Sequence, residues 1–568
     1  MSFEKRVTKQ FTQKEENLLR RYIFTNPYGD ISFIYPDHPL LAGEELSSLL
    51  AAYSRTHIPM QDRTLMFLAE KKYHESKEAL EFIRHHMGVF RNLDGSLKVS
   101  KKARNFTNRW ILKHGHNSIK EITSLFGMME NYSGIVLDYL RGHPLAKPQV
   151  KSTRYLDFAT ELNLSLEDED LAVLPGTLRD ECINHIKYMN SQYLKFTEFL
   201  CEKIRNHFWT KEAIDYELNQ GKNDDFDKEE WIENSIKQFV LDRSRMYLLP
   251  IVRNSQGFHI DGRTIEDVIN SMISSSSQEA VVAGNKLWDE AKKIAPVLLG
   301  ERSHIKPNEW EKYKHSDFRD FVESSYAKDI FTTSENNGNI HIITPKEIAK
   351  YGLDTLNAAQ AIFPHLDSSF LECVDLISDE SKAKEIIDKI HEHRTKFDGL
   401  DQNMAHLYPL TEILMPIHAY RDIYRHRKGS RSMQLYSTRN GFEVPKIFKE
   451  FNLEEEYVHD MQEAAKLYEK VRAVDPNLAE KFVPWSFNVR AIHSWDAHQQ
   501  EYIANLRTDI AKGNVTYVNL IRKMVDKLSE VMPLTVEHFR HKTDEYPEHL
   551  WKAGYNWWND VGKDKYAA

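Results

Sequence analysis

Apolar residues recur every three or four positions, with charged residues between them, along most of this chain of 568 residues. The spacing is typical of amphipathic helices, and it is clear over residues 138–143, 185–208, 410–424 and 518–532. We therefore predict a predominantly helical fold.

Two short apolar runs break the helical pattern and predict strands. They are ISFIYP (31–36) and NIHIITP (339–345), which share the arrangement Ile-x-x-Ile-x-Pro. Proline cannot donate a hydrogen bond to a sheet, so each strand is expected to stop there and to be followed by an amphipathic helix. The predicted fold class is therefore α+β with few strands.

Two polar motifs also occur twice. HGHNSIKE (114–121) and HEHRTKFD (391–398) both read His-x-His-x-Ser/Thr-x-x-acid, and QVKSTR (149–154) matches QLYSTR (434–439). The strand pair and these two pairs occur in the same order, at separations of 309, 277 and 285 residues in a chain of 568.

Three ordered matches near half the chain length indicate a tandem duplication. We predict two pseudo-repeated lobes, residues 1–305 and 306–568. The polar stretch between Gly300 and Gly338 has loop composition and is the expected seam.

Composition and charge exclude several classes of protein. The net charge of −9 argues against a nucleic-acid-binding protein, which needs a basic surface. Three scattered cysteines provide neither a disulfide framework nor a CxxC metal pair. A charged N-terminus and the lack of any run of about 18 apolar residues predict a cytoplasmic protein without a membrane partner.

The His-x-His motif allows three interpretations. Ser118 with Glu121, and Thr395 with Asp398, have the spacing of a helix capping box. A helix start is also a natural anion site, because its free amides and its dipole face the ligand. A metal site is the weakest interpretation, because no third ligand lies at a suitable spacing.

Residues 425–439, RHRKGSRSMQLYSTR, combine arginines and a lysine with hydroxyl side chains. Arg425, His426 and Arg427 are predicted to end the helix over 410–424 and to be followed by a Gly-Ser loop. Arginine provides the forked, permanently charged donors that phosphates require. The other interpretations are a solvated basic loop and simple compensation of the helix dipole.

These residues carry a family resemblance. RHR at a helix end, followed by Ser-x-Arg and preceded by HxHx[ST]xx[ED], resembles the flavin-dependent thymidylate synthases. Nine residues (Lys428–Tyr436) separate Arg427 from Ser437, two more than in the family pattern. The first lobe reads Arg141-Gly142-His143 in place of RHR, but keeps Ser152-Thr153-Arg154-Tyr155.

A later family element is also present. Val483-Pro484 is followed by Asn505-Leu506-Arg507, as in the family's LP pair and its Asn-Leu-Arg segment. In the first lobe Met272 or Ile273 stands where that arginine belongs. The arginine before the LP pair is kept as Arg245 in the first lobe and becomes Glu480 in the second.

The resemblance implies reductive methylation of dUMP, or of a related pyrimidine nucleotide, at C5. The cofactor would be FAD, with NADPH and methylenetetrahydrofolate as co-substrates. Arg507 would stabilise negative charge on the pyrimidine. The flavin contacts it implies are Arg425, His426, Arg427, His393, Thr395, Asn505, His116 and Ser118.

Ser437 and Arg439 would hold the nucleotide phosphate, joined by Ser152, Arg154, Tyr155 and Arg245 of the first lobe. Because the family's sites form between the subunits of a homotetramer, a homodimer of fused lobes would mimic that assembly. The resemblance implies no metal.

Two other functions remain open from the sequence. An eroded homologue that binds nucleotide or flavin without catalysis, as a scaffold, would also lack arginines in one lobe. A nucleic-acid-binding module built on the Arg425–Arg431 cluster would need more aromatic residues among the cations.

Overall fold

The computed structural model describes residues 23–34, 43–70, 92, 96–114, 117–158, 169–207, 211–219, 228–300, 303–326, 338–377, 379–407, 409–509, 513–544, 557 and 560. The chain divides into two compact units. Unit 1 comprises Met1–Tyr188, Leu249–Asp329 and Glu469–Phe482, and unit 2 comprises Met189–Leu248, Ile330–Tyr468 and Val483–Ala568. In the described part of the chain, no helix has the length and apolarity that a membrane span requires.

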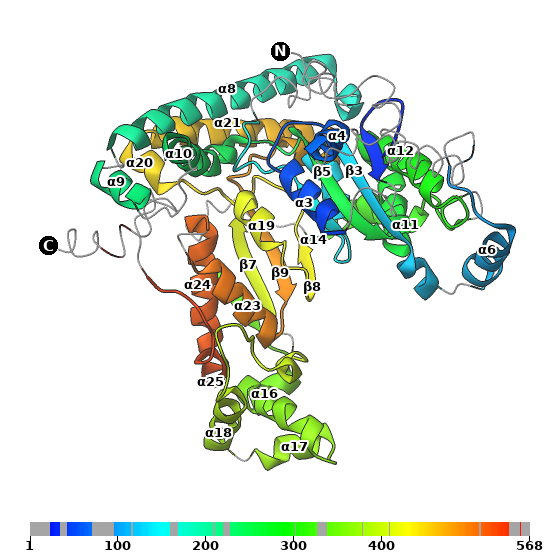
Figure 1. The fold of residues 1–568 in the computed structure, drawn as a ribbon. Coiled ribbons are helices and arrows are strands. Elements are labelled where there is room, and N and C mark those ends of the chain that lie inside the picture. The colour runs from blue at the N-terminus through cyan, green and yellow to red at the C-terminus, as the bar shows by residue number, and fades with distance from the viewer. Residues whose placement is uncertain are drawn as a thin grey trace. The chain divides into compact units, whose positions relative to one another are not determined.

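Unit 1 is built on an antiparallel sheet of strand order β1-β2-β3-β5-β4 (Figure 1). The strands are β1 (Ile23–Thr25), β2 (Ile31–Ile34), β3 (Ser124–Ser133), β4 (Lys147–Val150) and β5 (Arg253–Asp261). The helices that contribute to its core are α3 (Gly43–Tyr53), α4 (Met60–Glu70), α7 (Gly134–Gly142), α11 (Gly262–Ile273) and α12 (Gln278–Ile294).

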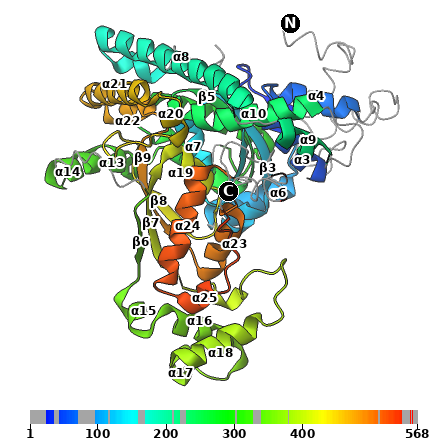
Figure 2. The ribbon, with the colours of Figure 1, turned by 90° about the vertical axis from the view of Figure 1, so that its left-hand side faces the viewer.

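Unit 2 has an antiparallel sheet of strand order β6-β7-β9-β8. The strands are β6 (Ile340–Ile343), β7 (Leu410–Pro416), β8 (Ser430–Met433) and β9 (Asn488–Ser494). Helices α23 (Ala497–Arg507) and α24 (Val515–Ser529) lie on one face of this sheet (Figure 2). A separate small core joins α16 (Leu353–Ile362), α17 (Phe370–Leu376) and α18 (Glu380–His391).

The two units repeat one topology. Without β1, the order β2-β3-β5-β4 of unit 1 becomes β6-β7-β9-β8 in unit 2. In each unit the second strand runs directly into a helix, α7 or α19 (Ile417–Ile423). The mixed, predominantly helical α+β class is confirmed, and the repeated order is what a tandem duplication predicts. The boundary at residues 305 and 306 stays a prediction.

Equivalent positions can be assigned from the third strand and the helix after it. Asp261 caps α11 and Asp496 caps α23, each by accepting hydrogen bonds from amides of the first turn. Ser133 pairs with Arg253 at the end of β3, as Pro416 pairs with Asn488 at the end of β7. Asp261 and Asp496 are 235 residues apart, and so are Arg253 and Asn488. Adding 235 to a residue of β5 or α11 therefore gives its equivalent in β9 or α23.

The helix predicted over 410–424 is partly wrong. Residues Leu410–Pro416 form β7, and only Ile417–Ile423 form α19. Pro416 lies at the N-cap, where its missing N–H costs the helix nothing. The apolar run before it satisfies its backbone in the sheet instead, between β6 and β9.

The sequence also underestimated the number of strands. The two predicted strands are confirmed as β2 and β6, whereas β1, β3, β4, β5 and β9 were missed, and β7 and β8 were assigned to a helix and a loop. The stretch 300–338, predicted as loop, contains α13 (Glu309–His315) and α14 (Asp317–Tyr326). Asn308 starts α13, because its side chain accepts a hydrogen bond from the amide of Trp310. The long helix predicted over 185–208 is confirmed within α8 (Gly176–His207).

Each unit includes a segment from the other half of the chain. Met189–Leu248 belongs to unit 2; it contains part of α8, with α9 (Lys211–Asn219) and α10 (Lys228–Ser244). Glu469–Phe482 belongs to unit 1. Both segments make buried ion pairs within their units, Arg245 with Asp422 and Lys481 with Asp170 and Glu279.

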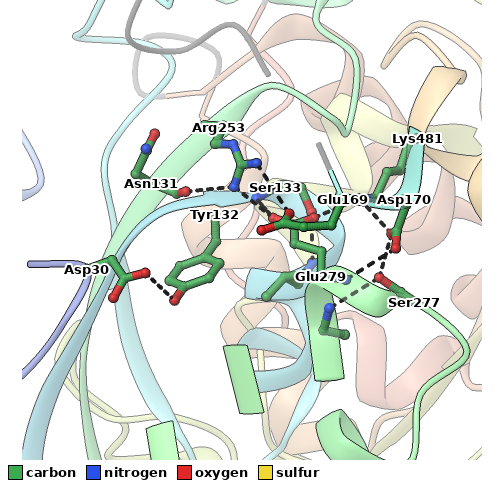
Figure 3. A network of polar contacts seen from close by, with 12 residues as sticks. Asp30, Asn131, Tyr132, Ser133, Glu169, Asp170, Arg253, Ser277, Glu279 and Lys481 are labelled. Carbon is green, nitrogen blue, oxygen red and sulfur yellow. Dashed lines mark hydrogen bonds and ion pairs between the residues drawn. The ribbon is translucent and has the colours of Figure 1, made fainter. Parts of the chain in front are cut away.

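Lys481 anchors its segment in unit 1 (Figure 3). Its buried ammonium lies 2.8 Å from Asp170 and 2.7 Å from Glu279. Glu279 also accepts hydrogen bonds from Arg253 and from the amide of Ser133, at the start of α7. Burial alone would raise the pKa of both carboxyls. The charge of Lys481, together with the hydrogen bonds that the carboxyls accept, outweighs burial and lowers the pKa of each.

Candidate functional site

The candidate site lies in unit 2, where α19 ends. Every residue of α19 is buried, so Asp422 is held in the interior while the chain emerges at Arg425. Arg245 lies between two buried carboxylates, 2.9 Å from Asp242 and 2.8 Å from Asp422. Asp422 is also 3.8 Å from Arg425. One carboxylate therefore joins the predicted Arg245 to the first arginine of RHR.

These contacts give Arg245 a positioning role. Its guanidinium is buried and forms ion pairs with two carboxylates. The contact with substrate that the sequence suggested for Arg245 stays a prediction. Arg245 orders the helix end that carries Arg425 and His426.

His426 and Arg507 are joined directly. The Nε of Arg507 donates a hydrogen bond of 2.9 Å to Nε2 of His426. Burial lowers the pKa of His426 to about 3, and the charge of Arg507 contributes. The imidazole is therefore neutral at pH 7, and because Nε2 accepts, its proton is on Nδ1. The hydrogen bond fixes Arg507 through Nε and leaves its two terminal nitrogens able to contact a ligand.

The remaining arginines crowd around this pair. Arg425 is exposed, and Arg427 is half-buried. Among the described residues Arg427 makes no hydrogen bond or ion pair. Burial lowers the pKa of its guanidinium, and the like charges of Arg431 and Arg425 add to the effect. A half-buried cation next to further cations favours an anionic ligand.

Residues 430–433, predicted as a Gly-Ser loop, form the edge strand β8. Gly429 enters the strand with φ +84°, and a Cβ there would lie 2.0 Å from the carbonyl of Ser494. Only glycine fits this approach. Arg431 donates to the carbonyl of Tyr424 and lies 5.2 Å from the centre of its ring.

The Ser-x-Arg turn is formed in both units. Ser437 Oγ accepts a hydrogen bond of 3.1 Å from the amide of Arg439, and Ser152 Oγ accepts one of 3.3 Å from Arg154. Ser152 is the second residue after β4, whereas Ser437 is the fourth residue after β8. The two extra residues of the second copy therefore lie between the strand and the turn.

Ser152, Arg154 and Tyr155 lie in unit 1. All three are partly exposed, and the guanidinium of Arg55 lies 5.2 Å from the centre of the Tyr155 ring. Their predicted contribution to a nucleotide site stays a prediction. Asn505 is exposed on α23, two residues before Arg507.

The His-x-His motif differs from the capping box that its spacing suggested. Thr395 donates from its amide and its hydroxyl to Asp398, at 2.9 and 2.6 Å, and residues 395–398 form a turn. The acid reaches back as in a capping box, but the chain does not continue as a helix there. His393 and Thr395 are exposed on this turn.

In the first copy Ser118 is exposed on a short 3-10 helix, Asn117–Ile122, and Glu121 pairs with Arg263. His116 lies outside the described residues. The flavin contacts predicted for these residues stay predictions. Within the described residues, no group of three or more His, Cys, Asp or Glu side chains could hold a metal ion.

The sequence reasoning missed two buried contacts next to this motif. Arg394 lies 2.5 Å from Glu501 of α23, and Lys120 lies 2.5 Å from Glu266 of α11. Glu266 and Glu501 are equivalent by the assignment above. Each copy therefore uses a cation from its His-x-His segment to hold the helix that carries position 272 or 507. The recurrence of a glutamate at equivalent positions, Glu266 and Glu501, was the sequence signal that could have predicted both contacts.

A polar row across the second sheet was also missed. Thr411 of β7 and Arg431 of β8 are the direct cross-strand partners of His493 in β9. Thr411 and His493 are fully buried, and the ring of His493 stacks on Trp495 at 4.1 Å between centres. The sequence of β9, NVRAIHS, does not alternate regularly between apolar and polar residues, so only the strand register reveals this row.

One family model matches the part of the chain that contains this site. Residues 354–534 match the family model described as thymidylate synthase complementing protein. A UPF0159 protein of Chlamydia muridarum is 21% identical over 443 residues, covering 76% of this chain and 80% of that protein. A UPF0159 protein of Chlamydia pneumoniae is 22% identical over 449 residues, with the same coverage.

Among solved structures, a UMP/dUMP methylase, PolB from Streptomyces cacaoi bound with 5-Br dUMP, shares 13% identity and aligns with a TM-score of 0.28. The alignment covers 35% of this chain and 93% of that chain. The family match contains RHR, Ser437, Arg439 and Arg507. The predicted resemblance to the flavin-dependent thymidylate synthases is therefore confirmed for this part of the chain.

Proposed function

We propose that this chain, a relative of the flavin-dependent thymidylate synthases, is a nucleotide methylase that binds a phosphorylated pyrimidine and FAD in unit 2. The hydrogen bond between His426 and Arg507 is the observation that carries the proposal. It joins the centre of the RHR motif to the arginine of the Asn-Leu-Arg segment, and both lie within the matched residues 354–534.

The residues present fit an anionic cofactor. Arg425 and Arg427 are cations on either side of the neutral His426 in the sequence, and within the described residues Arg427 has no carboxylate partner. Phosphate groups of a dinucleotide would provide the missing counter-charge. Bound FAD would supply hydride from NADPH to complete a methyl group whose carbon comes from methylenetetrahydrofolate.

Arg507 would act on the pyrimidine. As C5 becomes nucleophilic, negative charge develops on the ring, and a guanidinium fixed in advance stabilises that charge without reorganisation. His426 fixes it, because a neutral imidazole accepts the Nε–H and a protonated one would repel the cation. Ser437 and Arg439 would bind the nucleotide phosphate at the turn after β8.

The test is formation of dTMP from dUMP, with methylenetetrahydrofolate, NADPH and FAD, followed by mass spectrometry, with UMP in a parallel reaction. Arg507→Ala and Arg427→Ala should each lower turnover by about 10²–10³-fold, the usual loss on removing one preorganised donor. Gly142→Ala, at the equivalent RHR segment of unit 1, is the control, because a Cβ there meets no atom within 4 Å.

Equal activity of all three variants would contradict the proposed roles. A non-catalytic nucleotide-binding scaffold is the second candidate, favoured by the eroded RHR of the first copy, Arg141-Gly142-His143. Absorbance separates the two. An enzyme of this class shows an oxidised-flavin spectrum that NADPH bleaches, and a colourless protein that cannot be reconstituted with FAD would favour the scaffold.

A further inference from the structure

Several fully buried polar side chains of unit 2 have atoms without a hydrogen-bond partner among the described residues. They include both ring nitrogens of His493, both amide atoms of Gln500 and the hydroxyl of Thr411. Thr411 is the cross-strand partner of His493, and Gln500 lies on the first two turns of α23, directly after β9. These five atoms therefore lie on β7, on β9 and on the helix that follows β9.

A buried polar atom without a partner costs about 1–3 kcal/mol. Native proteins therefore keep such atoms only where ordered water or a ligand completes their hydrogen bonds. The structural alternative is that the fold requires polar residues at these positions. Unit 1 tests this alternative, because it contains the same strands and the same helix.

At the equivalent positions unit 1 is apolar. Phe258 replaces His493 and pairs with Gly127, which replaces Thr411. A Cβ on Gly127 would lie 2.5 Å from the Phe258 ring, so the ring fills the space above that glycine. On α11 the fully buried Ile265 replaces Gln500. The topology therefore needs no polar residue here.

We propose that His493 is a positioning residue of the candidate site, which acts through His426 and Arg507 by way of water molecules held together with Thr411 and Gln500. The inference rests on the proposed function and deepens it. His493 is set in the sheet by stacking on Trp495 and lies beside Arg431, its partner on β8. Arg431 in turn donates a hydrogen bond to the carbonyl of Tyr424, two residues before His426.

The chemistry requires His493 to be neutral. A neutral imidazole has one donor and one acceptor, so it can order water on both sides. Burial lowers the pKa of His493 to about 3, and the charge of Arg431 adds to the effect. Protonation would add a further cation beside Arg431 and His426, and would weaken the acceptor that holds Arg507.

The test uses His493→Phe, the residue that unit 1 carries, and His493→Gln, which keeps a donor and an acceptor. Titration calorimetry with dUMP should show an affinity lowered about tenfold for His493→Phe, the value of about one hydrogen bond, and at least half recovered for His493→Gln. In the Arg507→Ala background, His493→Phe should have no further effect. Phe258→Leu is the control and should bind dUMP as the wild type does.

Unchanged affinity of His493→Phe, or equal loss in both His493 variants, would overturn the inference. A second readout needs no nucleotide. In protein labelled with ¹⁵N-histidine, the Nε2 resonance of His426 should shift in His493→Phe and return toward the wild-type value in His493→Gln. If the wild type binds no dUMP, the proposed function fails, and an unmoved His426 resonance would separately reject the positioning role.

Discussion

Equivalent strand positions of the two sheets carry side chains of opposite character. In unit 1 one row across the sheet is apolar: Phe33, Gly127, Phe258 and Pro148. In unit 2 the same row is largely polar: Ile342, Thr411, His493 and Arg431. The helix that follows the third strand differs in the same way, because Ile265 and Met272 are replaced by Gln500 and Arg507.

The difference shows what each copy is suited to do. In unit 1 these positions fill space, and a Cβ on Gly284 of α12 would lie only 2.8 Å from Met272 Cβ. At the equivalent positions of unit 2, polar atoms of Thr411, His493 and Gln500 have no hydrogen-bond partner among the described residues. Proteins tolerate such groups at sites that bind ligands. The duplication has therefore left one copy as packed support and the other with the features of a site.

Buried charge separates the units as well. Lys481 is paired with Asp170 and Glu279, so this buried charge of unit 1 is neutralised within the fold (Figure 3). In unit 2, Arg245 is neutralised by Asp422 and Asp242, but the next cation along the site, Arg427, has no such partner among the described residues. The ion pairs of Lys481 and Arg245 hold exchanged segments in place, whereas Arg427 has no ion pair of this kind in the part of the chain that the structure describes.

The largest expected effect on stability comes from the network of unit 1. Lys481→Met leaves two carboxylates buried without their cation, and should lower the free energy of unfolding by about 3–5 kcal/mol. Chemical denaturation measures it. Lys470→Met, which removes only the exposed pair with Glu181, is the matched control and should cost less than about 1 kcal/mol. Similar losses in both variants would mean that Lys481 does not anchor its segment.

A second prediction concerns how the stability of unit 2 depends on pH. His426 and His493, both in unit 2, have a pKa of about 3 against an ordinary value of 6.5. The unfolded chain thus binds more protons, so the stability that these rings contribute is complete above pH 6.5 and is lost as the pH falls toward 3. Each ring should contribute a slope of about 1.4 kcal/mol per pH unit in that window.

Denaturation of the wild type and of His493→Phe between pH 4 and 6.5 measures this slope. The variant should lose the slope that His493 contributes, so its free energy of unfolding should change less steeply with pH. Parallel curves for the two proteins would show that His493 is not held neutral by the fold.

Local patterns in the sequence predicted much of the fold class and part of the site. The repeated Ile-x-x-Ile-x-Pro runs became β2 and β6, and the RHR and Asn-Leu-Arg segments meet as His426 and Arg507. Both depend on motifs of a few residues. The run before Pro416 was misassigned, because a short apolar segment has no period that separates a strand from a buried helix.

Long-range features were beyond such patterns. The exchange of Met189–Leu248 and Glu469–Phe482 depends on pairings such as Lys481 with Asp170, which no local pattern encodes. The polar row depends on strand register, since nothing in the sequence near His493 shows that Thr411 and Arg431 lie beside it.

The most direct test of the account is the number of nucleotides bound per chain. Because unit 1 has Met272 and Phe258 where unit 2 has Arg507 and His493, equilibrium titration with dUMP in the presence of FAD should saturate at one equivalent per chain. Arg507→Met should weaken binding at that one site measurably, and Met272→Leu should leave it unchanged. Two equivalents per chain, or an affinity that Arg507→Met leaves unchanged, would contradict the account.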